Sequence, residues 1–414
     1  MKTIKVGMIT GGFYPDYSGS ARQALSIARV MNSKNVPVTV FTLDMQKNIW
    51  TSPTTLDYVE NIPVYRIPGR TRSKIEILVR HARFIFECWR RRNLFDIVHA
   101  HGLREGYLGM FVSKLTCKPA LAKLVNVVET TSHWFAKGAL SEEDLGAVHD
   151  GTPLNNRIQQ QMTRKLDRVV CTTSRLQSIS REMGLAKSKL ALIPNGVDVG
   201  HFRSLPAASK RKSRKAFGWS PDEFVLISAL SVRRLKGLDI LLDAWLQLKS
   251  RLPRRLLIIG PSEAGMTGVD QGFVGEIHRQ AEKTAGYAPI TFAGQVDDIQ
   301  PYLSAANAFV LPSRSEGFPN TALEAMASGL PCIFSSISWT TEVVEDEVNA
   351  LLFTPEDSGH LCRQINRLMK NRTMQYRLGR SARKAVEKRF AIEAVAEQYS
   401  RLYRKILGAK RRKS

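Results

Sequence analysis

Short runs of apolar residues alternate along this chain with longer segments whose apolar residues recur at helical spacing. The run at 5–10 leads through a glycine-rich loop into a helical pattern, and the run at 224–230 starts a similar alternation in the second half. Buried strands that alternate with helices favour parallel sheets covered by helices on both faces. The pattern therefore predicts an α/β protein with two doubly wound, Rossmann-like domains.

At 414 residues the chain is long enough to form two hydrophobic cores. We place an N-terminal domain at 1–199 and a second domain at 223–388. The polar, basic stretch 200–222 is expected to be a linker, and 389–414 a final helix with a basic tail. Further strands are predicted at 36–44, 61–70, 95–102, 169–174, 254–260, 290–294 and 307–313, and helices at 73–92, 155–168, 363–371, 375–390 and 392–407.

The segment 307–331 contains the most informative pattern. An apolar run is followed by a short loop and then by strong helix formers, with Asn320 as the N-cap and Gly329 as the stop signal. The helix would begin at the carboxyl end of a strand, where open α/β sheets bind their ligands. Its free N–H groups suit a phosphate, and Gly317 allows the backbone to approach closely.

Two carboxylates flank this loop, Glu316 before the helix and Glu324 within it. A carboxylate beside a diphosphate would be repelled unless it had another task, and vicinal sugar hydroxyls supply one because carboxylates accept paired O–H donors. The alternative is that Glu316 is a solvated loop charge and Glu324 a charge on a helix face. Together the two residues favour a nucleotide-sugar site.

The stretch SEGFPNTALEAMASGLP at 315–331 resembles the paired-glutamate signature of the retaining GT-B glycosyltransferases of family 4, which are related to glycogen and sucrose synthases. The resemblance implies two domains with a donor in the cleft between them, and a last helix that returns to the first domain. It also implies that Glu316 contacts the donor hexose and Glu324 the ribose. The donor-binding loop would contain Gly317, Phe318, Pro319, Asn320 and Thr321.

Other positions follow from the same resemblance. Lys236, which is followed by a glycine and a helix, matches the family lysine that grips the donor diphosphate. The family arginine five residues earlier is replaced by Ser231, and Arg234 or Arg233 is the candidate substitute, with Arg234 preferred because it lies closer to Lys236. A cation here would stabilise the charge of the departing diphosphate.

The first half carries three further matches. Gly19 corresponds to a family glycine that faces the donor diphosphate, and the turn IPNGVD at 193–198 matches the end of the first domain. Relatives often place a histidine near the donor sugar; His133 is our choice for this role, with Glu129 and Thr130 as alternatives.

Two more positions concern the nucleobase and the acceptor. In the second half, Gln295 and Val296 lie where the family's main chain contacts the nucleobase. His101, at the end of the strand 95–102, is either a substrate contact or a hydrogen-bonded packing residue. The family's glycine turn after the signature is replaced by Ser338 to Thr341, so the donor sugar is left open.

Net charge and cysteine content indicate where in the cell the protein is expected. Five scattered cysteines suit a reducing cytosol, and no signal peptide or apolar run of about 20 residues is visible, so we expect a cytoplasmic protein. The net charge of +24 implies an anionic partner, either nucleic acid or a membrane surface. Basic residues cluster at 70–93, 210–215 and 401–414.

The first of these basic clusters is amphipathic. Segment 73–92 repeats apolar and aromatic residues at helical spacing among arginines, which is typical of a membrane-surface helix and equally of a core-packed helix with a charged face. No nucleic-acid-binding motif accompanies the charge. We therefore expect contact with an anionic membrane, peripheral on its inner face, and no nucleic-acid partner.

These observations predict a retaining glycosyltransferase that moves a hexosyl unit from a UDP- or GDP-linked sugar to a glycan or lipid-linked acceptor. The expected context is the synthesis of surface polysaccharide or glycolipid. No cofactor or metal is called for, because the nucleotide sugar is a substrate. The alternatives are a nucleotide-sugar epimerase or hydrolase on the same fold, and a non-catalytic protein that binds anionic surfaces.

Overall fold

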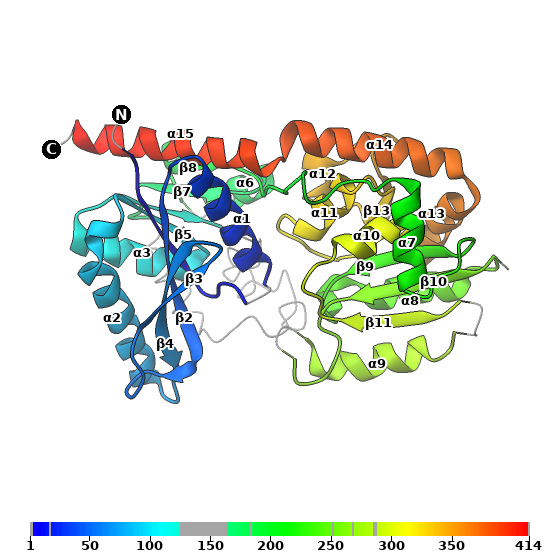
Figure 1. The fold of residues 1–414 in the computed structure, drawn as a ribbon, viewed down its shortest axis with the longest axis horizontal. Coiled ribbons are helices and arrows are strands. Elements are labelled where there is room, and N and C mark those ends of the chain that lie inside the picture. The colour runs from blue at the N-terminus through cyan, green and yellow to red at the C-terminus, as the bar shows by residue number, and fades with distance from the viewer. Residues whose placement is uncertain are drawn as a thin grey trace. The chain divides into compact units, whose positions relative to one another are not determined.

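The computed structural model describes residues 3–15, 18–124, 164–182, 184–250, 252–266, 269–284 and 288–412. The described chain divides into two compact units (Figure 1). Unit 1 contains the chain up to residue 124, then 164–196, and the last helix from Ile392 onward, whereas unit 2 contains Val197–Ala391. No described helix is both long enough and apolar enough to cross a bilayer.

Unit 1 is built on an eight-stranded sheet with the order β3-β4-β2-β1-β5-β6-β7-β8. All neighbouring strands are parallel except the hairpin of β3 and β4. Its strands are β1 (Val6–Thr10), β2 (Val38–Asn48), β3 (Thr55–Val59), β4 (Ile62–Arg70), β5 (Ile97–His101), β6 (Ala120–Lys123), β7 (Arg168–Cys171) and β8 (Leu190–Leu192). Strand order reverses between β1 and β5, where a doubly wound sheet changes direction.

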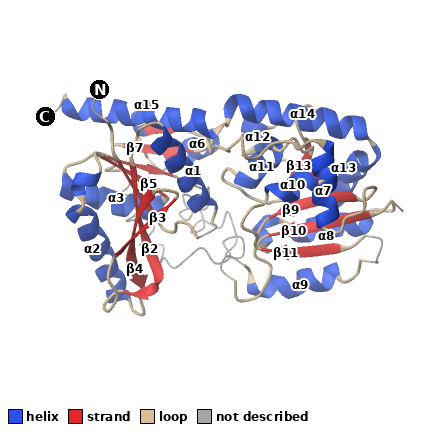
Figure 2. Cartoon of the chain, viewed as in Figure 1, coloured by secondary structure: helices blue, strands red, loops and turns tan. Residues whose placement is uncertain are grey.

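Helices cover both faces of this sheet, as Figure 2 shows in blue against the red strands. One face packs against α1 (Gly19–Ser33) and α15 (Ile392–Arg411), and the other against α2 (Lys74–Arg90) and α3 (Leu103–Thr116). The smaller elements are η1 (Arg92–Leu94), α6 (Ser174–Glu182) and η3 (Lys187–Lys189). Because side chains alternate along each strand, every strand of this sheet except β3 contributes to both apolar cores.

Unit 2 has a six-stranded, wholly parallel sheet with the order β11-β10-β9-β12-β13-β14. Its strands are β9 (Phe224–Ala229), β10 (Arg254–Ile259), β11 (Ile290–Gly294), β12 (Ala308–Leu311), β13 (Cys332–Ser335) and β14 (Leu351–Phe353). Its helices are α7 (Ala207–Ala216), η4 (Arg234–Lys236), α8 (Leu238–Gln247), α9 (Gln271–Ala281), α10 (Gln300–Ala305), α11 (Asn320–Ala327), α12 (Thr340–Val343), α13 (Ser358–Lys370) and α14 (Arg372–Arg389). The direction of winding changes between β9 and β12.

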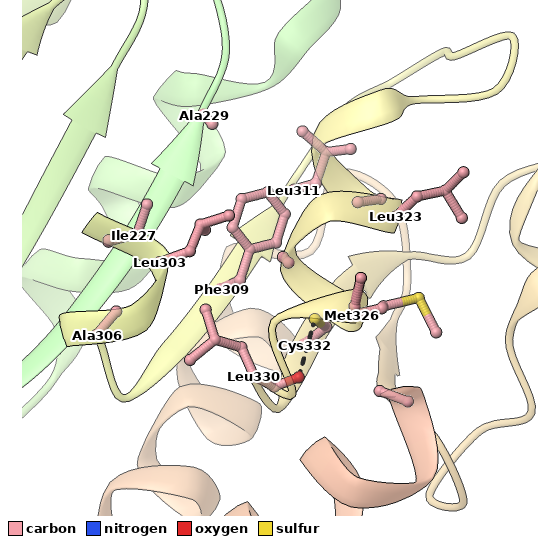
Figure 3. Packing of buried hydrophobic residues seen from close by; sticks show 14 of the residues in the cluster. Ile227, Ala229, Leu303, Ala306, Phe309, Leu311, Leu323, Met326, Leu330 and Cys332 are labelled. Carbon is pink, nitrogen blue, oxygen red and sulfur yellow. Dashed lines mark hydrogen bonds between the residues drawn. The ribbon is translucent and has the colours of Figure 1, made fainter. Parts of the chain in front are cut away.

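The core on one face of this sheet holds β12 and α11 in place. Figure 3 shows the ring of Phe309 from β12 between Leu303 of α10 and the α11 side chains Leu323 and Met326. All four side chains are fully buried. Burying a large apolar side chain contributes about 1.5–3 kcal/mol, so the position of α11 behind its loop is well fixed.

The prediction of two doubly wound α/β domains is confirmed. The stretch 200–222, expected to be a linker, contains α7, and Arg214 of this helix is buried and donates to the carbonyl of Ala305 at 3.0 Å. Strand β3 was not anticipated because its residues are mostly exposed, and most of the predicted helix 155–168 lies outside the described residues. The cysteines are free thiols; Cys88, Cys171 and Cys332 are buried, whereas Cys117 is exposed.

Candidate functional site

The candidate site of unit 2 lies where strand order reverses. Lys236 follows β9 at the end of η4, and Glu316 follows β12, the neighbouring strand across the reversal. The two side chains meet, with 2.7 Å between Lys236 Nζ and Glu316 Oε1. Ligands of open α/β sheets bind at the carboxyl ends of the strands on either side of such a reversal. Fold and motif therefore mark the same place.

Glu316 is held in position by more than this ion pair. Ser313 Oγ donates to Glu316 Oε1 at 2.9 Å, and Ser335 at the end of β13 donates to the carbonyl of Ser313. The side chains of Lys236 and Glu316 are 22% and 11% exposed, so both are shielded yet can be reached. The carboxylate can accept from hydroxyl donors, while the ammonium beside it can bind an anionic group.

Gly237 brings the two strand-end loops together. It has φ +65° and precedes α8, and a Cβ built on it would lie 2.1 Å from the carbonyl oxygen of Pro312. Only glycine adopts this conformation without strain and leaves room for the neighbouring loop. The glycine after Lys236 is thus a structural requirement for the closeness of Lys236 and Glu316.

Arg314 anchors the loop after β12 to neighbouring loops and helices of unit 2 by several charged hydrogen bonds. Its guanidinium donates to both oxygens of Asp239 at 2.9 Å and to those of Glu356 at 2.7 and 2.8 Å. It also donates to the carbonyl of Arg234 at 2.6 Å, and its own N–H donates to the carbonyl of Leu235 at 2.9 Å. Bidentate arginine–carboxylate pairs fix geometry as well as contributing energy.

The arginines proposed as substitutes for Ser231 point elsewhere. Arg234 is 46% exposed, pairs with both carboxylate oxygens of Glu276 at 3.0 Å, and lies 4.8 Å from the centre of the Phe273 ring. Arg233 Nε lies 3.8 Å from Asp270 Oδ1. Both arginines thus contact α9 or the residue that precedes it, whereas Lys236 alone of this group contacts Glu316.

Helix α11 begins one residue earlier than predicted. Asn320 is its first residue, and the capping position belongs to Pro319, which has no side-chain oxygen to offer. The proline fixes φ near the value that the helix start needs, so the chain turns without an asparagine cap. The helix ends at Ala327 before Gly329, whose φ is +74°, as expected.

The remaining loop residues surround the start of α11. Phe318 and Pro319 are buried, and Thr321 lies in the first turn of the helix. Glu324, one turn further, is buried, with 7% of its surface exposed. A carboxylate that is buried this deeply on a helix is not a solvated face charge.

Gln295 and Val296 come directly after β11, at the outer side of the sheet. Gly294, at the strand end, has φ +66°, and its carbonyl accepts from the N–H of Gly260 at 2.8 Å. Gln295 is exposed and Val296 half-buried. The main chain of this turn thus lies at the same carboxyl edge as Lys236 and Glu316.

In unit 1, Gly19 is the first residue of α1, and the Ser18 hydroxyl accepts from the N–H of Ala21 at 3.3 Å. The turn 193–198 is held by Gln23 of α1, which donates to the carbonyl of Gly196 at 2.6 Å and accepts from its N–H at 3.2 Å. This turn therefore has a structural role. His133, Glu129 and Thr130 lie outside the described residues.

His99 and His101 are buried at the carboxyl end of β5. His99 Nδ1 lies 2.7 Å from the hydroxyl of Tyr403 on α15, and the two histidine rings stack 4.3 Å apart. Burial lowers the pKa of His99 to about 3, and burial together with His99 and Lys123 lowers the pKa of His101 well below its usual value. Both imidazoles are therefore neutral at pH 7, His99 in a packing role.

The sequence analysis did not identify three residues that the structure brings to these places. Ser313 and Arg314 orient the loop after β12, and Lys123 is buried beside His101 in unit 1. The letters PSRSEG did contain Ser313 and Arg314 next to Glu316, and this adjacency was the available signal. Lys123 ends an apolar strand, where a lysine is unusual.

Two family models match most of the chain between them. The family model "Glycosyl transferases group 1" matches residues 209–385, and the model "Glycosyltransferase Family 4" matches residues 17–201. The chain is similar to D-inositol 3-phosphate glycosyltransferase of Streptomyces bingchenggensis, with 23% identity over 96% of this chain and 87% of the relative.

Solved structures resemble the chain over almost its full length. Sucrose-phosphate synthase from Thermosynechococcus elongatus has a TM-score of 0.81 and 22% identity, covering 98% of this chain and 100% of that one. Anabaena HepE in complex with UDP-glucose has a TM-score of 0.75 and 18% identity, covering 97% and 100%. These likenesses show that the two sheet domains have the GT-B fold.

Proposed function

We propose that this glycosyltransferase, whose halves match the family 4 and group 1 domains, transfers a hexosyl unit from a nucleoside diphosphate sugar with retention of configuration. The observation that carries the proposal is the contact of Lys236 with Glu316 at the strand reversal of unit 2. The relative solved with UDP-glucose adds support for a UDP-linked donor. GDP-linked donors remain part of the proposal.

The proposed donor site uses each residue for one task. Lys236 neutralises charge on the diphosphate, and the N–H groups at the start of α11 donate hydrogen bonds to the same group. Glu316, which Ser313 keeps in place, accepts from hydroxyls of the hexose. Glu324, buried within α11, accepts from the ribose hydroxyls.

Bond cleavage places negative charge on the departing β-phosphate and positive character on the sugar. Lys236 stabilises the first, and the carboxylate of Glu316, 2.7 Å from Lys236 Nζ, offsets the second. The acceptor hydroxyl attacks from the face that the diphosphate leaves and passes its proton to the departing β-phosphate oxygen. In this scheme no protein nucleophile forms a bond, so retention depends on how donor and acceptor are positioned.

The test is a panel of UDP- and GDP-linked sugars, first by thermal shift and then by product analysis. A bound donor raises the melting temperature according to its affinity. The anomeric configuration of the product, read by NMR from the coupling of the anomeric proton, should match the anomeric configuration of the donor. Lys236→Met should abolish transfer, whereas Lys114→Met, an exposed lysine on α3, should not. Inverted products, or full activity of Lys236→Met, contradict the proposal.

We also propose that α2 attaches the enzyme to an anionic membrane, where lipid-linked acceptors for polysaccharide or glycolipid synthesis are found. Ile75, Leu78, Ala82 and Phe86 are spaced as one face of this helix. This face is not covered by the core: Ile75, Leu78 and Phe86 are 72%, 67% and 52% exposed. Trp50, which is 61% exposed, donates from Nε1 to Glu76 at 3.2 Å and extends the apolar area.

Basic side chains accompany this apolar face. Arg70, Arg72, Lys74 and Arg90 are exposed at the ends of α2, and the chain carries a net charge of +24. Arg91 does not belong to this group, because it pairs with Glu87 and lies 4.3 Å from the centre of the Tyr65 ring. Exposed apolar side chains with cations beside them match the interface of an anionic bilayer.

Vesicle flotation tests this attachment. The wild type should float with phosphatidylglycerol-containing vesicles and lose binding as salt rises, while Ile75→Ser with Leu78→Ser should stay at the bottom. Leu252→Ser, which replaces a leucine that is 49% exposed in unit 2, is the matched control. Equal flotation of the double variant and the control contradicts membrane attachment and leaves the transferase proposal intact.

A further inference from the structure

A row of four polar side chains crosses the carboxyl end of the sheet in unit 1. Thr42 of β2 is in register with Thr10 of β1, Thr10 with His101 of β5, and His101 with Lys123 of β6. Residues in register on neighbouring parallel strands point to the same face. Thr42, Thr10, His101 and Lys123, called here the polar row, span the reversal of strand order between β1 and β5.

The polar row is buried and receives no hydrogen bonds from the part of the chain that the structure describes. Its members are at most 3% exposed. No hydrogen-bond partner among the described residues reaches the two threonine hydroxyls, the ring nitrogens of His101 or the ammonium nitrogen of Lys123. More than nine in ten buried polar groups in folded proteins are paired. Four adjacent buried residues without hydrogen-bond partners in the described chain are therefore unusual, and a bound polar ligand would satisfy them.

The described surroundings of the polar row are aromatic, and among the described residues no carboxylate pairs with the lysine. Lys123 Nζ lies 6.0 Å from the ring centre of Tyr399, and the ring of His99 lies 4.8 Å from that of Tyr399. Among the described residues, Tyr399 and Tyr403, both from α15, and the thiol of Cys171 also lie nearby, and burial keeps all three neutral. Burial lowers the pKa of Lys123 to about 7, and no acidic group among the described residues opposes this effect.

We propose that the polar row binds an anionic group, a phosphate or a carboxylate, of the glycosyl acceptor, with Lys123 as its counter-charge. Threonine hydroxyls and a neutral imidazole N–H supply donors for the oxygens of such a group. Because the site is shielded from solvent, the attraction between the two charges is stronger than it would be in water. The inference rests on the proposed transferase function and assigns the charge class of its acceptor.

Calorimetric titration of the full chain tests this assignment. The probes are inorganic phosphate, glucose 6-phosphate and malate, with glucose as the uncharged control and UDP and GDP as reporters of the donor site. The wild type should bind at least one anionic probe and not glucose. Lys123→Met should weaken that binding at least tenfold and leave nucleotide binding unchanged, and Lys114→Met should change neither.

Proton uptake provides a signature that a structural role would not produce. At pH 8, Lys123 is largely neutral before binding, and an anion favours its protonated form. The heat of binding should therefore vary with the ionisation enthalpy of the buffer in the wild type and not in Lys123→Met. His101→Gln keeps the lysine and should lower anion affinity severalfold while preserving proton uptake.

The outcomes separate this inference from the proposed function. If the wild type binds UDP or GDP but none of the anionic probes, or if Lys123→Met binds them as the wild type does, the acceptor assignment is wrong and the transferase proposal stands. If Lys123→Met loses nucleotide binding as well, the polar row serves the donor and the inference is overturned. If no nucleotide binds to the wild type, the proposed function itself fails.

Discussion

Replacing Lys123 by methionine should stabilise the protein, by an amount that depends on pH. Methionine has a similar length and no charge, so the substitution removes a buried ammonium that has no hydrogen-bond partner among the described residues. Burial lowers the pKa of Lys123 from 10.5 to about 7. Between these values the unfolded chain binds a proton that the folded chain does not, so the stability of the wild type rises with pH in this window.

The magnitude follows from the pKa difference. Each pH unit contributes about 1.36 kcal/mol, so the wild type should gain about 4 kcal/mol relative to Lys123→Met between pH 7 and pH 10. At pH 7 and below, the variant should be the more stable protein, by several degrees in melting temperature at about 2–4 °C per kcal/mol. Lys114→Met, which changes an exposed lysine, should follow the wild type at every pH.

Urea unfolding of the three proteins at half-unit steps from pH 6.5 to pH 10 measures this difference. The reasoning predicts that the stability advantage of Lys123→Met shrinks steadily as pH rises. A constant difference across the range would refute it, because the lysine would then have an ordinary pKa in the folded state. A variant less stable than the wild type at pH 6.5 would show that the ammonium has a stabilising partner.

Three further predictions concern other positions. Gly237→Ala should destabilise unit 2 by at least about 2 kcal/mol more than Gly218→Ala in thermal unfolding, because both glycines have positive φ but only the first has a carbonyl 2.1 Å from the added Cβ; equal losses would contradict this. Arg314→Lys should raise the dissociation constant of the donor about tenfold in calorimetry, since lysine cannot pair with two carboxylates in bidentate fashion; unchanged affinity would show that the loop needs no such tie. His99→Gln should reduce the loss of stability on acidification, because burial lowers the pKa of His99 to about 3 and the unfolded chain therefore takes up an extra proton below pH 6.5; identical acid unfolding profiles would argue against it.

Local patterns carried most of the fold and part of the site. Strands and helices follow from apolar spacing, which is a property of neighbouring residues, and Glu316 and Lys236 were identified within short motifs. That they touch follows from the order of strands, since β9 and β12 are adjacent in the sheet although 80 residues separate the two side chains. Sequence analysis assigned both residues to the donor site, and the strand order explains why they meet there.

What sequence could not give were pairings over long separations. Arg314 is matched to Asp239 and Glu356, 75 and 42 residues away, and no local signal marks them as partners. Arg234 was preferred because it is close to Lys236 in sequence, yet the turn of η4 directs it to Glu276. The polar row joins residues from four strands, so it becomes visible only when their register is known.

The most direct test of the donor site is calorimetry on Glu316→Gln, Glu324→Gln and the double variant. Each protein is titrated with the sugar nucleotide that the panel selects and with the corresponding nucleoside diphosphate, which lacks the sugar. Each glutamine removes a charged acceptor worth about 1.5–3 kcal/mol. Glu316→Gln should weaken the sugar nucleotide at least tenfold and the nucleoside diphosphate much less, and Glu324→Gln should weaken both. A double variant that binds and turns over the donor like the wild type would contradict the account.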